Sequence, residues 1–189
     1  AAISVDIIEE VYDKTPIAVT YILLCTGILI FIQVRSVLIP LKAMVMNILS
    51  LTASFGMLVY VFQEGHGFED WMNFTPLSID PTTPVIMFCI VFGLSMDYEV
   101  LMLSRIHEAY LETGDNTEAV RRGLQQTGRL ITGAAAVMVV VFASFAIATV
   151  QIIKAIGLGL ALAIAIDATL VRAIVVPATM RLMGDLNWW

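Results

Sequence analysis

Five long apolar runs, separated by more polar segments, form the pattern of this chain. They cover about residues 17–35, 41–63, 84–104, 129–150 and 155–181, and each provides the roughly 20 residues that a helix needs to cross a bilayer. Hydrophobic residues make up 59% of the 189 and charged residues 14%, which is too apolar for a soluble domain. The pattern therefore predicts an all-α, polytopic transmembrane helical bundle with five spans.

The polar segments carry their basic residues on one side of the predicted membrane. Eight lie near the two turns and the chain end on that side, whereas the other side receives only Lys14 and Lys154. By the positive-inside rule, the first span crosses inward and the C-terminus is cytoplasmic. The formal net charge of -6 and the scattered Lys and Arg residues exclude a nucleic-acid surface.

Residues 1–15 are predicted to end an extracytoplasmic region with a short lead-in helix, and residues 16–189 to form the transmembrane domain. We expect Thr15 to cap the first span and Pro16 to begin it, because proline suits the first helical position. The acidic, turn-rich segment of about residues 63–84 should lie on the outer membrane surface.

The segment of about residues 105–128 is predicted to be a cytoplasmic connector. The third helix should extend into it and stop at Gly114, after which Asp115 and Glu118 fit a capping pattern for a short helix through Gln126. This helix either rests on the inner leaflet or lies solvated in the cytoplasm.

A carboxylate, Asp97, lies near the middle of the third run. Placing it in hydrocarbon costs about 2.5–3.5 kcal/mol, so such residues usually face other helices or a wet cavity and serve function. Gly93, one turn away, lets a neighbouring helix approach. We expect Asp97 to be shielded from lipid and to change protonation state as its cavity wets and dries. The alternative is a permanent pair with Arg172 that only holds two helices together.

Other polar residues within the runs allow a supporting network. Tyr98 is positioned to donate a hydrogen bond to a carboxylate on an adjacent helix, and Glu99 either joins a relay or reaches the water–lipid boundary. Asp167 and Arg172 fall on two different stripes of the fifth run, yet both favour a structural polar network. Interhelical hydrogen bonds are expected from the stripe Asn47, Ser50 and Ser54.

Several motifs resemble those of the MMPL family of resistance-nodulation-division transporters. They include Gly-Leu-Ser-Met-Asp-Tyr-Glu-Val from Gly93, Thr-Gly-Arg-Leu-Ile-Thr from Thr127, Ile-Asp-Ala-Thr-Leu-Val-Arg from Ile166, and the closing Asn187-Trp-Trp. The match covers nearly the whole chain in the family's order. The resemblance implies that the chain is the last five helices of a twelve-helix protein of the bacterial inner membrane, built from two related halves.

The resemblance also implies a mechanism. In that family an Asp-Tyr pair on this helix faces a partner pair in the other half and forms a proton relay, and Asp97 and Tyr98 match this motif. It implies a secondary active transporter and not an enzyme, driven by the proton-motive force and exporting lipids or other hydrophobic compounds. Glu99, Asp167, Arg172, Asn47 and Ser50 would support the relay.

No metal or other cofactor is implied, since protons are the coupling ion and no catalytic residue is assigned. The implied partners are the missing N-terminal half with its own Asp-Tyr pair, membrane lipids and the hydrophobic substrate, while a homo-oligomer stays open. One alternative is a lipid-sensing or scaffolding domain without transport, similar to a sterol-sensing domain. The last is an intramembrane aspartyl protease that uses Asp97 and Asp167, although neither lies in a Gly-x-Gly-Asp setting.

Overall fold

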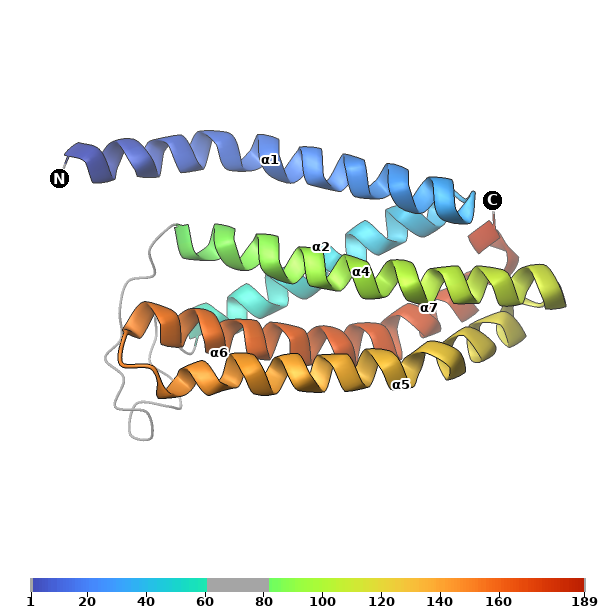
Figure 1. Cartoon of the computed structure of the whole chain (residues 1–189). Coiled ribbons are helices and arrows are strands. Elements are labelled where there is room, and N and C mark those ends of the chain that lie inside the picture. Colours follow the sequence, from blue (N-terminus) through green and yellow to red (C-terminus); the bar gives the residue numbers. More distant parts are fainter. Residues whose placement is uncertain (1, 61–81, 189) are drawn as a thin grey trace.

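The computed structural model describes residues 2–60 and 82–188, and in these ranges the regular structure is entirely helical (Figure 1). Five helices there are long and apolar enough to cross a membrane. The predicted all-α bundle with five spans is therefore confirmed. Nearly all of the expected outer loop, including His66, lies outside the described residues.

The first helix, α1 (Ala2–Val34), runs without interruption through Pro16. The expected cap at Thr15 with a new helix at Pro16 is therefore wrong. Proline removes one backbone donor, but helices in membranes tolerate this where hydroxyl side chains satisfy the freed carbonyl groups. The helix therefore lacks the backbone hydrogen bond from residue 16 to the carbonyl of residue 12, and still continues. The lead-in segment and the first span thus form one rod.

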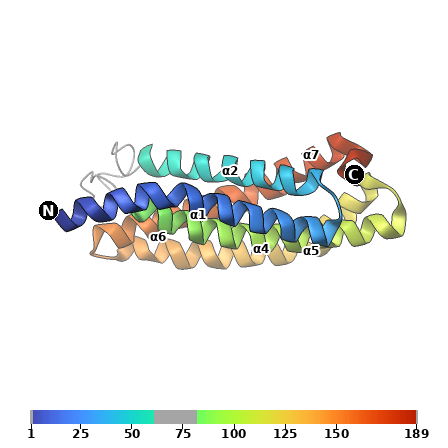
Figure 2. The same cartoon turned by 90° about the horizontal axis from the view of Figure 1, so that it is seen from above.

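The second helix, α2 (Leu38–Leu58), follows a tight turn. Arg35 in this turn has a positive φ of 54°. Figure 1 shows α1 running beside α4 (Thr82–Thr113), while α2 diverges from α1 after their shared turn; α1 contacts both helices. Figure 2 shows the same bundle from above.

The turn between α4 and α5 (Asn116–Ala143) is short, with Gly114 at a φ of 66°. The Asp115 side chain caps α5 by accepting from the backbone N–H of Thr117 at 2.8 Å. The expected cap is present, but the expected short helix is not separate, because α5 continues unbroken into the fourth span. A Cβ on Gly123 would lie 2.9 Å from the Ile106 backbone, so α4 and α5 are in very close contact there. This packing holds the N-terminal part of α5 against α4.

The last span is built from three consecutive helical segments of different winding. They follow a short 3-10 turn, η2 (Ser144–Ile147), and are α6 (Gln151–Ile166), the π-helix η3 (Asp167–Val175) and α7 (Val176–Met183). In a π-helix the hydrogen bonds join residues five apart, and such segments are frequent at functional sites. Here the π-helix carries Asp167 and Arg172, whereas Lys154 lies in α6 and Arg181 in α7.

The C-terminal segment η4 (Gly184–Trp188) is held against the rest of the bundle. The Trp188 ring stacks on Tyr110 with centroids 4.0 Å apart, and its indole N–H donates to Asn116 at 3.1 Å. Ser36 donates to the backbone carbonyl oxygen of buried Asn187 at 2.6 Å. The α1–α2 turn, the α4–α5 turn and η4 therefore meet at one end, which we call the C-terminal end of the bundle (Figure 1).

Candidate functional site

Six polar side chains are buried together where α2, α4 and η3 meet, and we call them the polar cluster. Each is at most 6% exposed, and they are Asn47, Ser50, Ser95, Glu99, Asp167 and Arg172. Buried polar groups of this kind are tolerated only when hydrogen bonds replace their lost hydration. The network of contacts below therefore decides what the cluster can do.

Arg172 and Asp167 form the central ion pair of the cluster, with Nε 2.7 Å from Oδ2. At α-helical winding, residues five apart would point about 140° away from each other. The π-helix removes this offset, since its hydrogen bonding brings residues five apart above one another. Arg172 also donates to Ser95, to the backbone carbonyl oxygen and, at 2.6 Å, to the hydroxyl oxygen. It therefore joins the last span to α4.

Asn47 connects the ion pair to Glu99. Its Nδ2 donates to Glu99 Oε2 at 2.8 Å, and its Oδ1 accepts from the Ser95 hydroxyl at 2.5 Å. The Ser95 oxygen also lies 3.1 Å from Asp167 Oδ2, and Ser50 donates to Asp167 Oδ1 at 3.3 Å. Glu99 is thus buried between helices and does not reach a water–lipid boundary.

Asp97 lies on a different side of α4 and is exposed in this chain. It lines a groove of about 560 Å³ between α4 and α1, whose other wall includes Ile22, Thr26 and Gln33. Arg172 pairs with Asp167 and not with Asp97, which removes the alternative of a permanent Asp97–Arg172 pair. The described residues do not supply the shielding that was expected of neighbouring helices, because only α1 runs beside this face.

Tyr98 faces the side of the polar cluster. The Arg172 guanidinium lies 5.6 Å from the centre of its ring, within reach of a cation–π interaction. Its hydroxyl lies 3.7 Å from the sulfur of Met138 on α5, and not against the carboxylate that was expected. Asp97 and Tyr98 therefore connect two environments: one faces the groove and the other faces the cluster.

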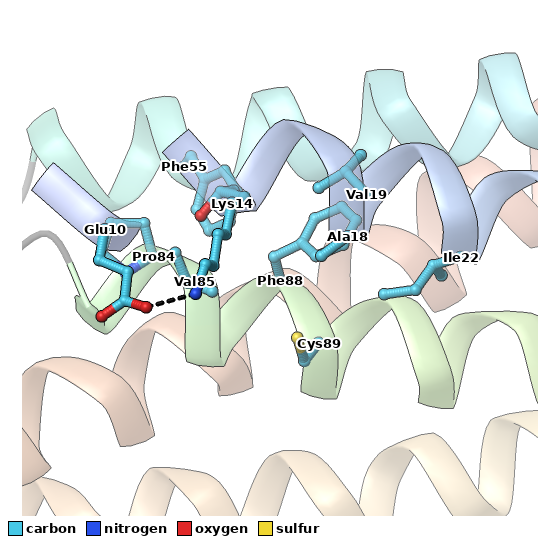
Figure 3. A pocket seen from close by; sticks show the side chains of 11 residues that line it. Glu10, Lys14, Ala18, Val19, Ile22, Phe55, Pro84, Val85, Phe88 and Cys89 are labelled. Carbon is cyan, nitrogen blue, oxygen red and sulfur yellow. Dashed lines mark hydrogen bonds and ion pairs between the residues drawn. The ribbon is translucent and has the colours of Figure 1, made fainter. Parts of the chain in front are cut away.

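A second hollow, of about 460 Å³, continues the groove along α1 and α4 (Figure 3). Its walls are mainly apolar and include Val19, Phe55 and Phe88, and it shares Ile22 and Cys89 with the Asp97 groove. We call this hollow the apolar pocket. Together with the groove it forms a path between α1 and α4 that reaches the Asp97 carboxylate.

An ion pair stands at the edge of the apolar pocket, where Lys14 donates to Glu10 (Figure 3). This hydrogen bond lowers the pKa of the Glu10 carboxyl below its usual value. Both side chains are exposed, so the pair contributes little to stability. Its position places charge at one end of an otherwise apolar pocket.

Two buried residues near the site were missed by the sequence reasoning. Ser95 bridges Asn47 and Asp167, and its spacing of four residues from Glu99 was the available signal. Lys42 is only 8% exposed, although it had been counted simply as a basic residue near the first turn. Neither residue has a pattern that distinguishes burial from exposure without knowledge of the packing.

Known proteins resemble this chain along its whole length. The model of the MMPL family matches residues 1–189. The chain is 40% identical to the trehalose monomycolate exporter MmpL3 of Mycobacterium tuberculosis H37Rv over 190 residues, all of this chain and 20% of that protein. The heme uptake protein MmpL11 of the same organism is 40% identical over 185 residues, 97% of this chain and 19% of that protein. The mycolic acid-containing lipids exporter MmpL11 of Mycolicibacterium smegmatis is 37% identical over 97% of this chain and 19% of its own length. The chain thus spans about a fifth of the length of these relatives.

Proposed function

This chain belongs to the MMPL family, and on that premise we propose that it is half of the membrane domain of a proton-driven exporter of lipids or other hydrophobic compounds. It is part of a multi-pass membrane protein from a family of transporters. In the proposed cycle Asp97 accepts and releases the proton and Tyr98 orients the pair. The partner pair would come from the other half of the same transporter.

The position of Asp97 is the observation that carries this proposal. Its carboxyl lies midway along a spanning helix and faces a groove, where water or a second helix can reach it. Protonation there would remove one charge from the membrane interior and change the relative stability of two packings of the halves. Asp167 is less suited to this role, because its carboxylate is buried and already paired with the Arg172 guanidinium.

Tyr98 supports the coupling from the other side of α4. Its ring packs near Arg172, so a change at Asp97 that turns or shifts α4 would also move the polar cluster. We propose that this cluster keeps α2, α4 and η3 together while the halves move. It then supports the relay pair from the other side of α4.

The apolar pocket favours a hydrophobic ligand, either the substrate or a membrane lipid, on the face of α4 that carries Asp97. Apolar walls with a few polar groups at the edge are typical of sites for such ligands. The names of the relatives include lipid exporters and a heme uptake protein, so the particular cargo does not follow from similarity.

The geometry gives no support to an aspartyl protease. Such enzymes need two carboxyl groups about 3 Å apart that share one proton. Asp97 lines the groove beside α1, whereas Asp167 is buried against Arg172 on another side of α4. A lipid sensor without transport remains the other outcome of the experiment below.

We expect the basic residues of the C-terminal end of the bundle to face the cytoplasm. This end includes Arg35, Arg105 and Arg181, and the positive-inside rule favours such an orientation. Labelling of a single cysteine placed at Asp185 by a membrane-impermeant reagent in intact cells would test it. Protection of that cysteine from the reagent supports the orientation, and labelling would show that this end faces outward.

The function itself is tested by Asp97→Asn in the full-length transporter. This change keeps the shape but removes the titratable group, so export of the hydrophobic substrate from cells should fall by about 10²-fold or more. Asp185→Asn, at an exposed carboxylate of η4, is the matched control and should export normally. Equal amounts of both proteins in the membrane are required. Normal export by Asp97→Asn would rule out the proposed relay, whereas absence of export by the unaltered protein would favour the sensor.

A further inference from the structure

Two buried groups of opposite charge, one on α2 and one on α4, have atoms without hydrogen-bond partners among the residues that the structure describes. Lys42 is in the first turns of α2 and is 8% exposed, while Glu99 on α4 is 4% exposed. Within the described residues, Lys42 Nζ and Glu99 Oε1 make no hydrogen bond. The other oxygen of Glu99 accepts from Asn47 at 2.8 Å, so the free oxygen is the one not committed to the polar cluster.

These two groups act on each other electrostatically. Arg172 and Asp167 of η3 also act on Glu99, both more strongly than Lys42 does. With all four ionised, their formal charges sum to zero.

The contrast with the neighbouring ion pair is informative. Arg172 and Asp167 are in direct contact at 2.7 Å, as expected of a pair with a structural role. In the described part of the chain Arg172 Nη1 also lacks a hydrogen-bond partner, but Nε and Nη2 of Arg172 are bonded, whereas Lys42 Nζ has no partner and Glu99 keeps Oε1 free. Unpartnered buried charges cost several kcal/mol and are rare. A polar site of this kind can hold a bridging water, which makes hydrogen bonds to both groups.

We propose that Lys42 and Glu99 form a proton-exchange pair that connects the polar cluster to water at the C-terminal end of the bundle. In the exchange one Nζ–H bond of the ammonium breaks and one O–H bond forms at Oε1, directly or through one water. The pair passes from two opposite charges to two neutral groups, and no proton is gained or lost in this step. Uptake of a proton by neutral Lys42, or its release from neutral Glu99, then changes the charge of the cluster by one.

This inference rests on the proposed proton-driven function, since it supplies a second protonatable site for the same cycle. It adds a role that Asp97 does not fill. Asp97 faces the α1 groove, whereas Lys42 and Glu99 lie on the cluster side of α4. A change in the charge of the cluster would then act on Arg172. Because the Arg172 guanidinium lies over the Tyr98 ring, the change would also act on Tyr98.

The test compares side chains that keep the charge with side chains that can exchange the proton. Proton flux is measured with the purified full-length transporter in liposomes, with a pH-sensitive dye inside. Lys42→Arg keeps a positive charge but does not release its proton, so flux should fall roughly tenfold or more. Glu99→Gln should lose a similar amount, whereas Glu99→Asp should retain flux with a shifted pH profile. Glu112→Gln, at an exposed carboxylate near the same end, is the control and should behave as the unaltered protein.

Each result decides the matter. Flux with Lys42→Arg equal to that of the unaltered protein would overturn the exchange role and leave Lys42 as a fixed charge. If Asp97→Asn stops the flux while Lys42→Arg and Glu99→Gln do not, this inference fails and the proposed function stands. If Asp97→Asn leaves the flux intact, the proposed function fails as well. Should single variants not fold, the double variant Lys42→Met/Glu99→Gln keeps the cluster neutral; normal flux there would contradict the proposal.

Discussion

At the residue scale, the two aspartates within the spans have opposite surroundings. Asp167 is 6% exposed and accepts from Arg172, Ser50 and Ser95, whereas Asp97 is exposed toward a groove. Asp167 is thus committed to the polar cluster, whereas the Asp97 carboxyl stays accessible from the groove. We therefore propose a structural role for Asp167 and a proton-carrying role for Asp97.

Removing Arg172 should therefore destabilise the protein, whereas neutralising Asp97 should not. Arg172→Met leaves the buried Asp167 charge unpaired, which should lower the free energy of unfolding by about 3–5 kcal/mol. Asp97→Asn serves as the control and should change it by less than about 0.5 kcal/mol. Denaturation of the detergent-purified full-length protein measures both. Equal stability of the two variants would show that the ion pair does not hold the helices together.

At the element scale, the polar cluster depends on a change of helical winding. Sequence patterns assume about 3.6 residues per turn, so Asp167 and Arg172 were placed on separate stripes. The π-helix η3 brings the two side chains together, and the sequence of residues Asp167–Val175 does not predict this winding. A polar network could be predicted because both buried charges need partners. Which atoms are in contact could not be predicted.

Helix boundaries show the same limit. Pro16 is a frequent first residue of a helix, yet α1 continues through it. Asp115 was correctly expected to cap a helix, but that helix is the fourth span itself. Local signals predict where a cap or turn fits, while tertiary packing decides whether a helix continues.

The close contact of α4 and α5 should be sensitive to one methyl group. Gly123→Ala would place a Cβ 2.9 Å from backbone atoms of Ile106, which forces the helices apart and should cost about 1–3 kcal/mol. Gly133→Ala on the same helix has open space and should be neutral or slightly stabilising. Thermal unfolding of the full-length protein compares the two. A Gly123→Ala variant as stable as Gly133→Ala would contradict this packing.

At the scale of the whole molecule, the chain leaves much apolar surface uncovered. Only 17% of the apolar window of the first span and 11% of that of the fourth are buried within the described residues. Exposed residues such as Leu24, Ile28 and Val140 suit lipid or a further helical unit. Since the chain spans about a fifth of its relatives, we expect part of this surface to contact the rest of the transporter.

The candidate site was predictable to different degrees. Asp97 and Tyr98 follow from a carboxylate within an apolar run and from the family motif. Lys42 and Ser95 were not identified, because a lysine near a span end usually reaches water and a serine within a span usually bonds its own helix. Only the packing of α2 against α4 and η3 shows that both are buried.

The account depends most on proton coupling at Asp97, and one measurement tests it directly. Substrate transport is followed in liposomes that contain the full-length transporter, with and without an imposed proton gradient. We predict that the gradient accelerates transport by the unaltered protein and has no effect on Asp97→Asn, although the variant stays folded. Equal acceleration of the two proteins would contradict the account.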